Sequence, residues 1–208
     1  MKVLAEIPAP ASSELRLRPG TLRRADLVAY ADLLDALGDA RAVLVAGEAA
    51  GRPAGAVGLA TAATAAGGRV ALLECDLSRP ALADALGLSH APGLHEYLRG
   101  EARSQDILRP VVLAGPGSAG ASDALVCVVA GRSSDEAAAL LDSERFGHVL
   151  RRLRESYELV VIDAPPADAG EVVFTALGAA VDAVLAWAER GASPPELPIP
   201  ATGLVVQG

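Results

Sequence analysis

Short apolar runs alternate along most of the chain with alanine- and leucine-rich segments of helical length. The runs are apolar at nearly every position, which is typical of parallel strands covered on both faces. The segments between them place apolar residues on one helical face, and several end at glycines. The expected strands are 41–46, 69–74, 110–114, 125–130, 159–162, 183–187 and 203–207, and the expected helices are 21–37, 53–66, 81–86, 93–100, 136–156 and 171–180.

This alternation predicts an α/β protein: one doubly wound domain over residues 21–208, with a mostly parallel sheet flanked by helices. Residues 1–20 are predicted to form an extended N-terminal arm, because the alternating prolines of Ile7-Pro8-Ala9-Pro10 restrict the backbone to extended conformations. The helix expected at 136–156 is predicted to be interrupted near Gly147. Four prolines exclude a helix from residues 190–201.

Composition narrows the possible functions. The chain is 51% hydrophobic but only 3% aromatic, so its core must consist mainly of alanine, valine and leucine. The net charge of −8 argues against non-specific nucleic-acid binding. Cys75 and Cys127 lie inside apolar runs and are expected to be buried, reduced thiols. No apolar run is long enough to span a membrane, the three histidines form no cluster, and no signal-peptide pattern is present.

The segment Val43–Leu59 carries the strongest functional pattern, with a strand, a glycine-rich turn from Gly47 to Gly55, and the start of a helix. This arrangement can cradle a phosphate between backbone N–H groups and a helix N-terminus. A working phosphate loop reads G-x-x-x-x-G-K-[ST]. Gly51 stands at the position of the last glycine, but Arg52 and Pro53 follow it in place of lysine and a hydroxyl residue.

Two aspartates are expected at the same edge of the sheet. Asp76 follows the strand at 69–74, and Asp163 follows the strand at 159–162. An apolar strand that ends in aspartate is how a phosphate-loop enzyme holds Mg²⁺, either directly or through water. Each aspartate alone is also a common turn residue, so it is their occurrence together with the glycine turn that predicts a site.

These motifs occur in a recognisable order. Glu74–Pro80 (ECDLSRP) follows the second strand, Gly93–Gly100 (GLHEYLRG) comes next, and Asp163–Pro166 (DAPP) closes a later strand. The order resembles the cytoplasmic catalytic domain of the bacterial tyrosine autokinases of capsule and exopolysaccharide systems, which belong to the MinD/ParA-type P-loop ATPases. The start of the chain, Val3–Pro8, resembles the segment that joins these kinases to their membrane part.

The resemblance implies a role for each candidate residue. Gly47, Gly51 and Arg52 would form a phosphate loop for ATP or ADP, Asp163 and Asp76 would bind Mg²⁺, and Asp76 would also act in catalysis by orienting the attacking group. The loop departs from the family, however. Arginine does not replace lysine as a compact charge, and Pro53 has neither the hydroxyl for Mg²⁺ nor a backbone N–H for a phosphate.

Three functions remain open. The first is a degenerate P-loop ATPase or tyrosine-autokinase-like domain that regulates or scaffolds polysaccharide biosynthesis or export. The second is an active ATPase or kinase with an arginine-containing loop, and the third is a non-catalytic protein-interaction module. The cofactor is accordingly ATP or ADP with Mg²⁺, or none. The resemblance implies a cytoplasmic location at the inner face of the plasma membrane. The expected partner is a membrane-embedded chain-length or export protein or an active paralogue, with a homo-oligomer also open.

Overall fold

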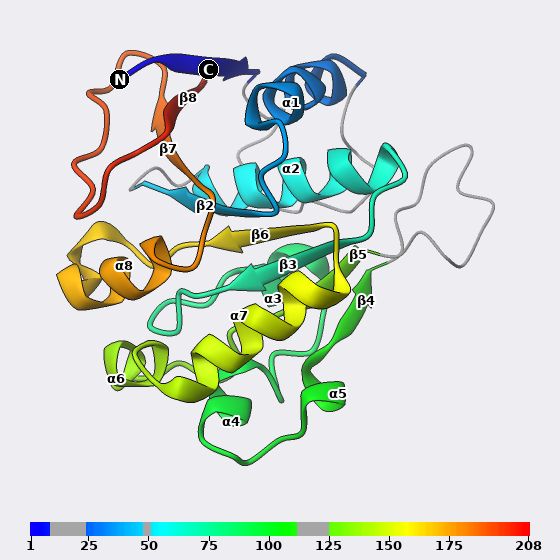
Figure 1. The fold of residues 1–208 in the computed structure, drawn as a ribbon, viewed down its shortest axis with the longest axis vertical. Coiled ribbons are helices and arrows are strands. Elements are labelled where there is room, and N and C mark those ends of the chain that lie inside the picture. The colour runs from blue at the N-terminus through cyan, green and yellow to red at the C-terminus, as the bar shows by residue number, and fades with distance from the viewer. Residues whose placement is uncertain (9–23, 48–50, 112–124) are drawn as a thin grey trace.

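The structure is a computed structural model that describes residues 1–8, 24–47, 51–111 and 125–208 (Figure 1). Side chains of 24–27 and 168 lie outside this description, as do residues 112–114 of the strand expected at 110–114. Within the described residues, no helix is both long and apolar enough to cross a membrane.

One sheet of eight strands runs through the described part of the chain, in the order β1-β8-β7-β2-β6-β3-β5-β4. Neighbouring strands are parallel except for β4, which pairs antiparallel with β5. The strands are β1 (Val3–Ile7), β2 (Ala42–Ala46), β3 (Val70–Glu74), β4 (Arg109–Val111), β5 (Leu125–Val128), β6 (Leu159–Asp163), β7 (Ala183–Glu189) and β8 (Gly203–Gln207). This architecture confirms the predicted doubly wound α/β fold.

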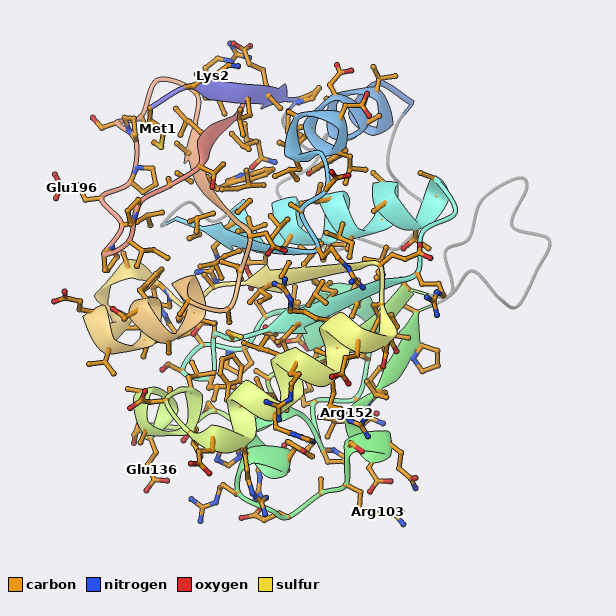
Figure 2. The ribbon with its side chains drawn as sticks, viewed as in Figure 1. Met1, Lys2, Arg103, Glu136, Arg152 and Glu196 are labelled. Carbon is orange, nitrogen blue, oxygen red and sulfur yellow. The ribbon has the colours of Figure 1, made fainter. Side chains whose placement is uncertain are left out.

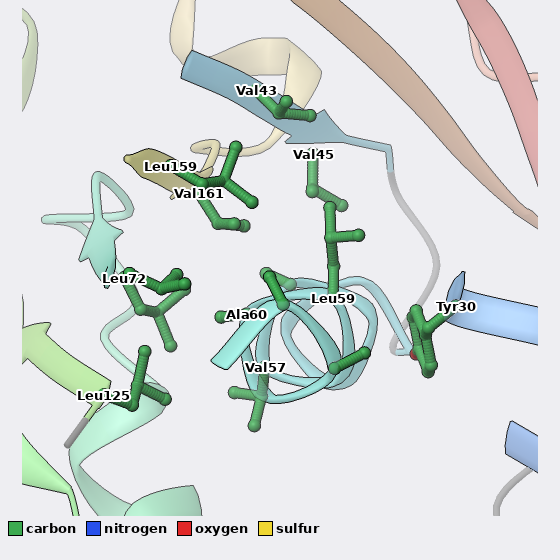
Figure 3. Packing of buried hydrophobic residues seen from close by; sticks show 14 of the residues in the cluster. Tyr30, Val43, Val45, Val57, Leu59, Ala60, Leu72, Leu125, Leu159 and Val161 are labelled. Atoms are coloured by element: carbon green, nitrogen blue, oxygen red, sulfur yellow. The ribbon is translucent and has the colours of Figure 1, made fainter. Parts of the chain in front are cut away.

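Helices cover both faces of the sheet, and each face has its own hydrophobic core. On one face, Val57 and Leu59 of α2 belong to the same core as the strand residues Val43 and Val161, and Figure 3 shows Leu59 beside Val45. On the other face, Phe146 of α7 belongs to a second core. The helices are α1 (Arg24–Leu37), α2 (Arg52–Ala65), α3 (Leu82–Leu86), α4 (Leu94–Leu98), α5 (Ser104–Ile107), α6 (Ala137–Leu141), α7 (Glu144–Ser156) and α8 (Glu171–Gly178), with a 3₁₀ turn η1 (Ala167–Ala169).

The central helix α2 follows the glycine turn and is buried along almost its whole length. Pro53 is tolerated because it lies in the first turn, where N–H groups have no partner within the helix. Two glycines allow close packing: a Cβ on Gly58 would lie 2.2 Å from the Tyr30 hydroxyl, and one on Gly55 would lie 2.6 Å from the Trp187 ring. Tyr30 stands beside α2 in Figure 3. Helix α2 is therefore held in place by both α1 and β7.

The prediction of one helix over 136–156 with an interruption near Gly147 was wrong in the position of the break. The chain forms α6 and α7, separated at Asp142 and Ser143, and Gly147 lies inside α7. The Ser143 hydroxyl accepts a hydrogen bond from the Phe146 N–H at 3.3 Å. This N-terminal cap starts a new helix at Glu144. Gly147 does not interrupt the helix, because a single glycine lowers helix stability by only about 1 kcal/mol relative to alanine.

The start of the chain is extended where it is described. Val3–Ile7 forms β1, which pairs in parallel with β8 at one edge of the sheet, while residues 9–20 of the expected arm lie outside the described part. A salt bridge of 2.9 Å between Arg190 and Glu6 also ties this strand to the end of β7. The division into an arm and a domain stays a prediction.

Both cysteines are buried, free thiols, as predicted. Burial raises the pKa of Cys75 and of Cys127 well above the usual value, so both thiols keep their protons. Residues 190–201 form no helix, which confirms the interpretation of their four prolines.

Candidate functional site

Arg52 connects the phosphate-loop region with both predicted site aspartates. Its Nε donates to Oδ1 of Asp163 at 2.8 Å. Its Nη2 lies 3.4 Å from Oδ2 of Asp163 and 3.4 Å from Oδ2 of Asp76. All three side chains are buried: Arg52 is 6% exposed, Asp76 4% and Asp163 0%. The guanidinium group thus forms a buried ion-pair network with both carboxylates.

The parallel sheet explains why these residues meet. Asp163 is the last residue of β6 and pairs in register with Val45 of β2 on one side and with Glu74 of β3 on the other. The backbone continues this pairing beyond β3, because the Cys75 N–H donates to the Asp163 carbonyl at 2.9 Å. The carboxyl ends of β2, β3 and β6 therefore place Arg52, Asp76 and Asp163 at one edge, as the sequence predicted.

Asp163 is the most perturbed carboxyl group of the site. Burial raises its pKa to about 7, while the Arg52 guanidinium works in the opposite direction. The nearby carboxylates of Glu74 and Asp76 also raise the pKa of Asp163. Because removing a charge from water is costly, this carboxyl depends on Arg52 to remain ionised near neutral pH.

Asp76 has a second structural contact. Its Oδ1 accepts a hydrogen bond from the Arg79 N–H at 2.9 Å, while its Oδ2 faces Arg52. An aspartate that accepts from a backbone N–H three residues later fixes a turn. Both oxygens of the proposed Mg²⁺ and catalytic residue therefore already have partners in the chain.

Glu74 is buried beside the two aspartates but faces backbone groups. Its Oε1 accepts from the N–H groups of Ala81 and Leu82 at 2.5 and 2.7 Å, and its Oε2 accepts from Ala130 N–H at 2.8 Å. These bonds fasten the start of α3 and Ala130, the second residue after β5, to the end of β3. Burial nevertheless leaves the pKa of Glu74 raised. The side chain is a structural clamp.

Replacing Glu74 with glutamine is expected to lower the free energy of unfolding by about 2 kcal/mol. The amide NH₂ cannot accept a hydrogen bond, so at least one of these buried N–H groups loses its partner. Urea unfolding measures the loss, and Glu101→Gln, an exposed carboxylate, is the control. An E74Q variant as stable as the parent protein would contradict the clamp.

Two residues of the last strands approach Gly47 and Gly51, which flank the undescribed residues 48–50 of the glycine turn, and motif reasoning missed this contact. A Cβ on Gly51 would lie 1.9 Å from Oε1 of Gln207, which accepts a hydrogen bond from Trp187 Nε1 at 3.2 Å. A Cβ on Gly47 would lie 2.3 Å from the Trp187 carbonyl oxygen. No local sequence pattern identifies a residue that reaches the site from β7 or β8.

The described side chains do not fit a Mg²⁺ nucleotide site. Arg52 engages the carboxylates, and Pro53 offers no hydroxyl. Oε1 of Gln207 lies where a Cβ on Gly51 would stand. Within the described ranges, no group of three or more histidine, cysteine, aspartate or glutamate side chains has an arrangement that could hold a metal ion. The fold brings the expected residues together, but their contacts are with one another.

Comparison with curated proteins identifies bacterial tyrosine kinases as relatives. Tyrosine-protein kinase ptk of Acinetobacter johnsonii is 30% identical over 108 residues, which cover 52% of this chain and 14% of that protein. Tyrosine-protein kinase wzc of Salmonella typhi is 29% identical over 98 residues, which cover 47% of this chain and 12% of that protein. The matched region is thus a small part of these relatives. No protein-family profile matches the chain.

Comparison with solved structures identifies the same fold. The kinase domain of Escherichia coli tyrosine kinase ETK superposes with a TM-score of 0.80 at 18% identity, covering 100% of this chain and 90% of that one. The BceF tyrosine kinase domain gives 0.80 at 20% identity, covering 100% and 93%. MinD from Pyrococcus horikoshii, complexed with Mg-ADP, gives 0.55 at 19% identity, covering 70% and 56%. These comparisons confirm the resemblance to tyrosine kinases and the P-loop NTPase-like fold.

Proposed function

We propose that this chain is a tyrosine-kinase-like domain that no longer binds Mg²⁺ nucleotide productively, and that it regulates or scaffolds polysaccharide biosynthesis or export. The buried Arg52–Asp163 ion pair carries the proposal. In a phosphate loop, the residue at this position reaches a bound phosphate and an aspartate at the end of a neighbouring strand serves Mg²⁺. Here the two side chains neutralise each other.

Pro53 supports the same conclusion independently of the ion pair. A serine or threonine at this position would supply both a backbone N–H for a phosphate and a hydroxyl for Mg²⁺, and proline supplies neither. Because Asp163 and Asp76 both contact Arg52, a metal ion would have to displace the guanidinium group before it could use them. A domain that kept the fold but lost catalysis would have all of these contacts.

The partner follows from the resemblance. A domain related to the capsule and exopolysaccharide kinases would act at the inner face of the plasma membrane by docking on a membrane-embedded chain-length or export protein, or on an active paralogue. Co-purification of the tagged chain with such a protein would support this role, and a partner unconnected with polysaccharide export would favour a general interaction module instead.

Isothermal titration with Mg·ATP and Mg·ADP at about 1 mM is expected to give no binding heat, because Arg52 engages both aspartates and Pro53 lacks the hydroxyl. A Kd weaker than about 1 mM corresponds to a binding free energy of less than about 4 kcal/mol. Asp163→Ala is the matched control, and it is also expected to give no binding heat. Saturable binding that the Asp163→Ala substitution abolishes would overturn the proposal in favour of an active enzyme with an arginine-containing loop.

A further inference from the structure

A cationic groove follows helix α7 on the outer face of the molecule, away from the phosphate loop. It consists of two open hollows, of about 600 and 520 Å³, which meet at Gly147 and Arg151. Arg145 and His148 line the first hollow, and Arg154 lines the second. This local cluster of arginines contrasts with the chain as a whole, which has a net charge of −8.

Two of these arginines retain unused binding capacity. Within the described part of the chain, Arg145 donates a hydrogen bond to the Tyr97 carbonyl at 3.1 Å, and Arg151 donates one to Nδ1 of His148 at 2.9 Å. Neither has a carboxylate partner there, and both side chains are exposed. Since a guanidinium group has five N–H donors, each keeps most of them for a ligand. Because Arg151 uses the Nδ1 lone pair, His148 presents Nε2–H as a further donor.

Acidic residues near the groove are only partly available to neutralise it. Asp182 pairs with Arg154 at 2.9 Å, and Glu155 lies 3.8 Å from Arg152. Glu144 is the remaining carboxylate in the lining. With Arg41, which also lines the second hollow, the groove holds four arginines and three carboxylates, so it carries an excess of one positive charge.

We infer that this groove docks an acidic segment of a partner protein. From Arg145 to Arg154 the helix advances about 13 Å, which matches about four residues of extended chain. A lipid surface fits less well, because the apolar side of α7, including Phe146 and Leu153, is buried in the core. The inference does not depend on whether the phosphate loop binds nucleotide.

The test uses a fluorescein-labelled octaglutamate peptide and the full chain in low salt. Arg145→Gln/Arg151→Gln is expected to weaken binding about fivefold, as two exposed charge pairs are lost. Arg103→Gln/Arg190→Gln is the matched control: it removes the same charge from exposed arginines outside the groove, of which Arg103 is labelled in Figure 2. This control is expected to bind within a factor of two of the parent protein.

Two further readouts locate the binding. The Gly147 amide resonance is expected to shift on addition of octaglutamate, because Gly147 lines both hollows, and octaglutamine is expected to leave it unchanged. Equal weakening by both double variants would overturn the inference, since it would show a response to net charge alone. Binding to phosphatidylserine-containing vesicles that only the Arg145/Arg151 variant loses would overturn it in favour of a lipid surface.

Discussion

Replacing Arg52 with methionine is expected to lower the free energy of unfolding by about 3 kcal/mol near pH 8.5, because breaking a buried ion pair leaves its partner without compensation. Asp163 is fully buried, and Glu74 and Asp76 add like charge around it. Arg52 is the cation that both aspartates contact. Urea unfolding of the variant and the parent protein at fixed pH measures the loss.

The loss is expected to depend on pH. Asp163 has an ordinary pKa of 3.8, which the folded protein raises to about 7. A carboxyl with a raised folded pKa holds its proton in the folded state, so its contribution to stability is complete below about pH 4 and is lost as pH rises through 7. Without Arg52 the folded pKa of Asp163 lies higher still. The deficit of R52M is therefore expected to be small near pH 5.5 and to grow above pH 7.

Two variants separate this effect from general damage. Arg52→Met/Asp163→Asn removes both charges and is expected to recover a large part of the stability at pH 8.5. Arg103→Met removes an arginine whose partner, Asp106, is on the surface, and is expected to leave unfolding unchanged at both pH values. A deficit for R52M that is equal at pH 5.5 and pH 8.5 would contradict a role for Asp163 ionisation.

The sequence predicted the fold well because the determining signals are local. The apolar runs that became β2, β3 and β6 have no polar face, and short glycine-ended connections leave few alternatives to parallel pairing. The placement of Arg52 and Asp163 at one edge of the sheet followed from the same topology, since parallel strands bring their carboxyl ends to one edge. Strand ends and motif spacing were therefore sufficient to identify the candidate residues.

The contacts of those residues could not be predicted in the same way. Spacing gave no reason to expect that Arg52 would turn toward Asp163 instead of toward a ligand, because that choice depends on burial and on the surrounding charges. Gln207 reaches Gly51 from the last strand, at a sequence separation that no local pattern spans. The helix break at Ser143 was missed because the glycine at position 147 was taken as the helix breaker, whereas Ser143 caps the start of α7.

The double variant Arg52→Lys/Pro53→Thr, which restores the G-K-[ST] end of the motif, is expected to bind Mg·ATP with a Kd below about 1 mM, where the parent chain is expected to show no binding. Lysine supplies a compact ammonium group, and threonine returns both the backbone N–H and the hydroxyl. The single variants are the controls: Arg52→Lys leaves the metal without its hydroxyl, and Pro53→Thr leaves the guanidinium group on Asp163. Isothermal titration of all three variants measures the gain.

Adding Asp163→Ala to the double variant distinguishes a restored site from non-specific binding. If the aspartate at the end of β6 serves Mg²⁺ once Arg52 is gone, this third substitution removes the binding that the first two produced. A folded double variant that binds nothing would place the obstacle at the Gly51 α-carbon, where Gln207 and Trp187 meet. Adding Gln207→Ala to that variant would then show whether the strand contact, and not Arg52 with Pro53, keeps nucleotide out of the loop.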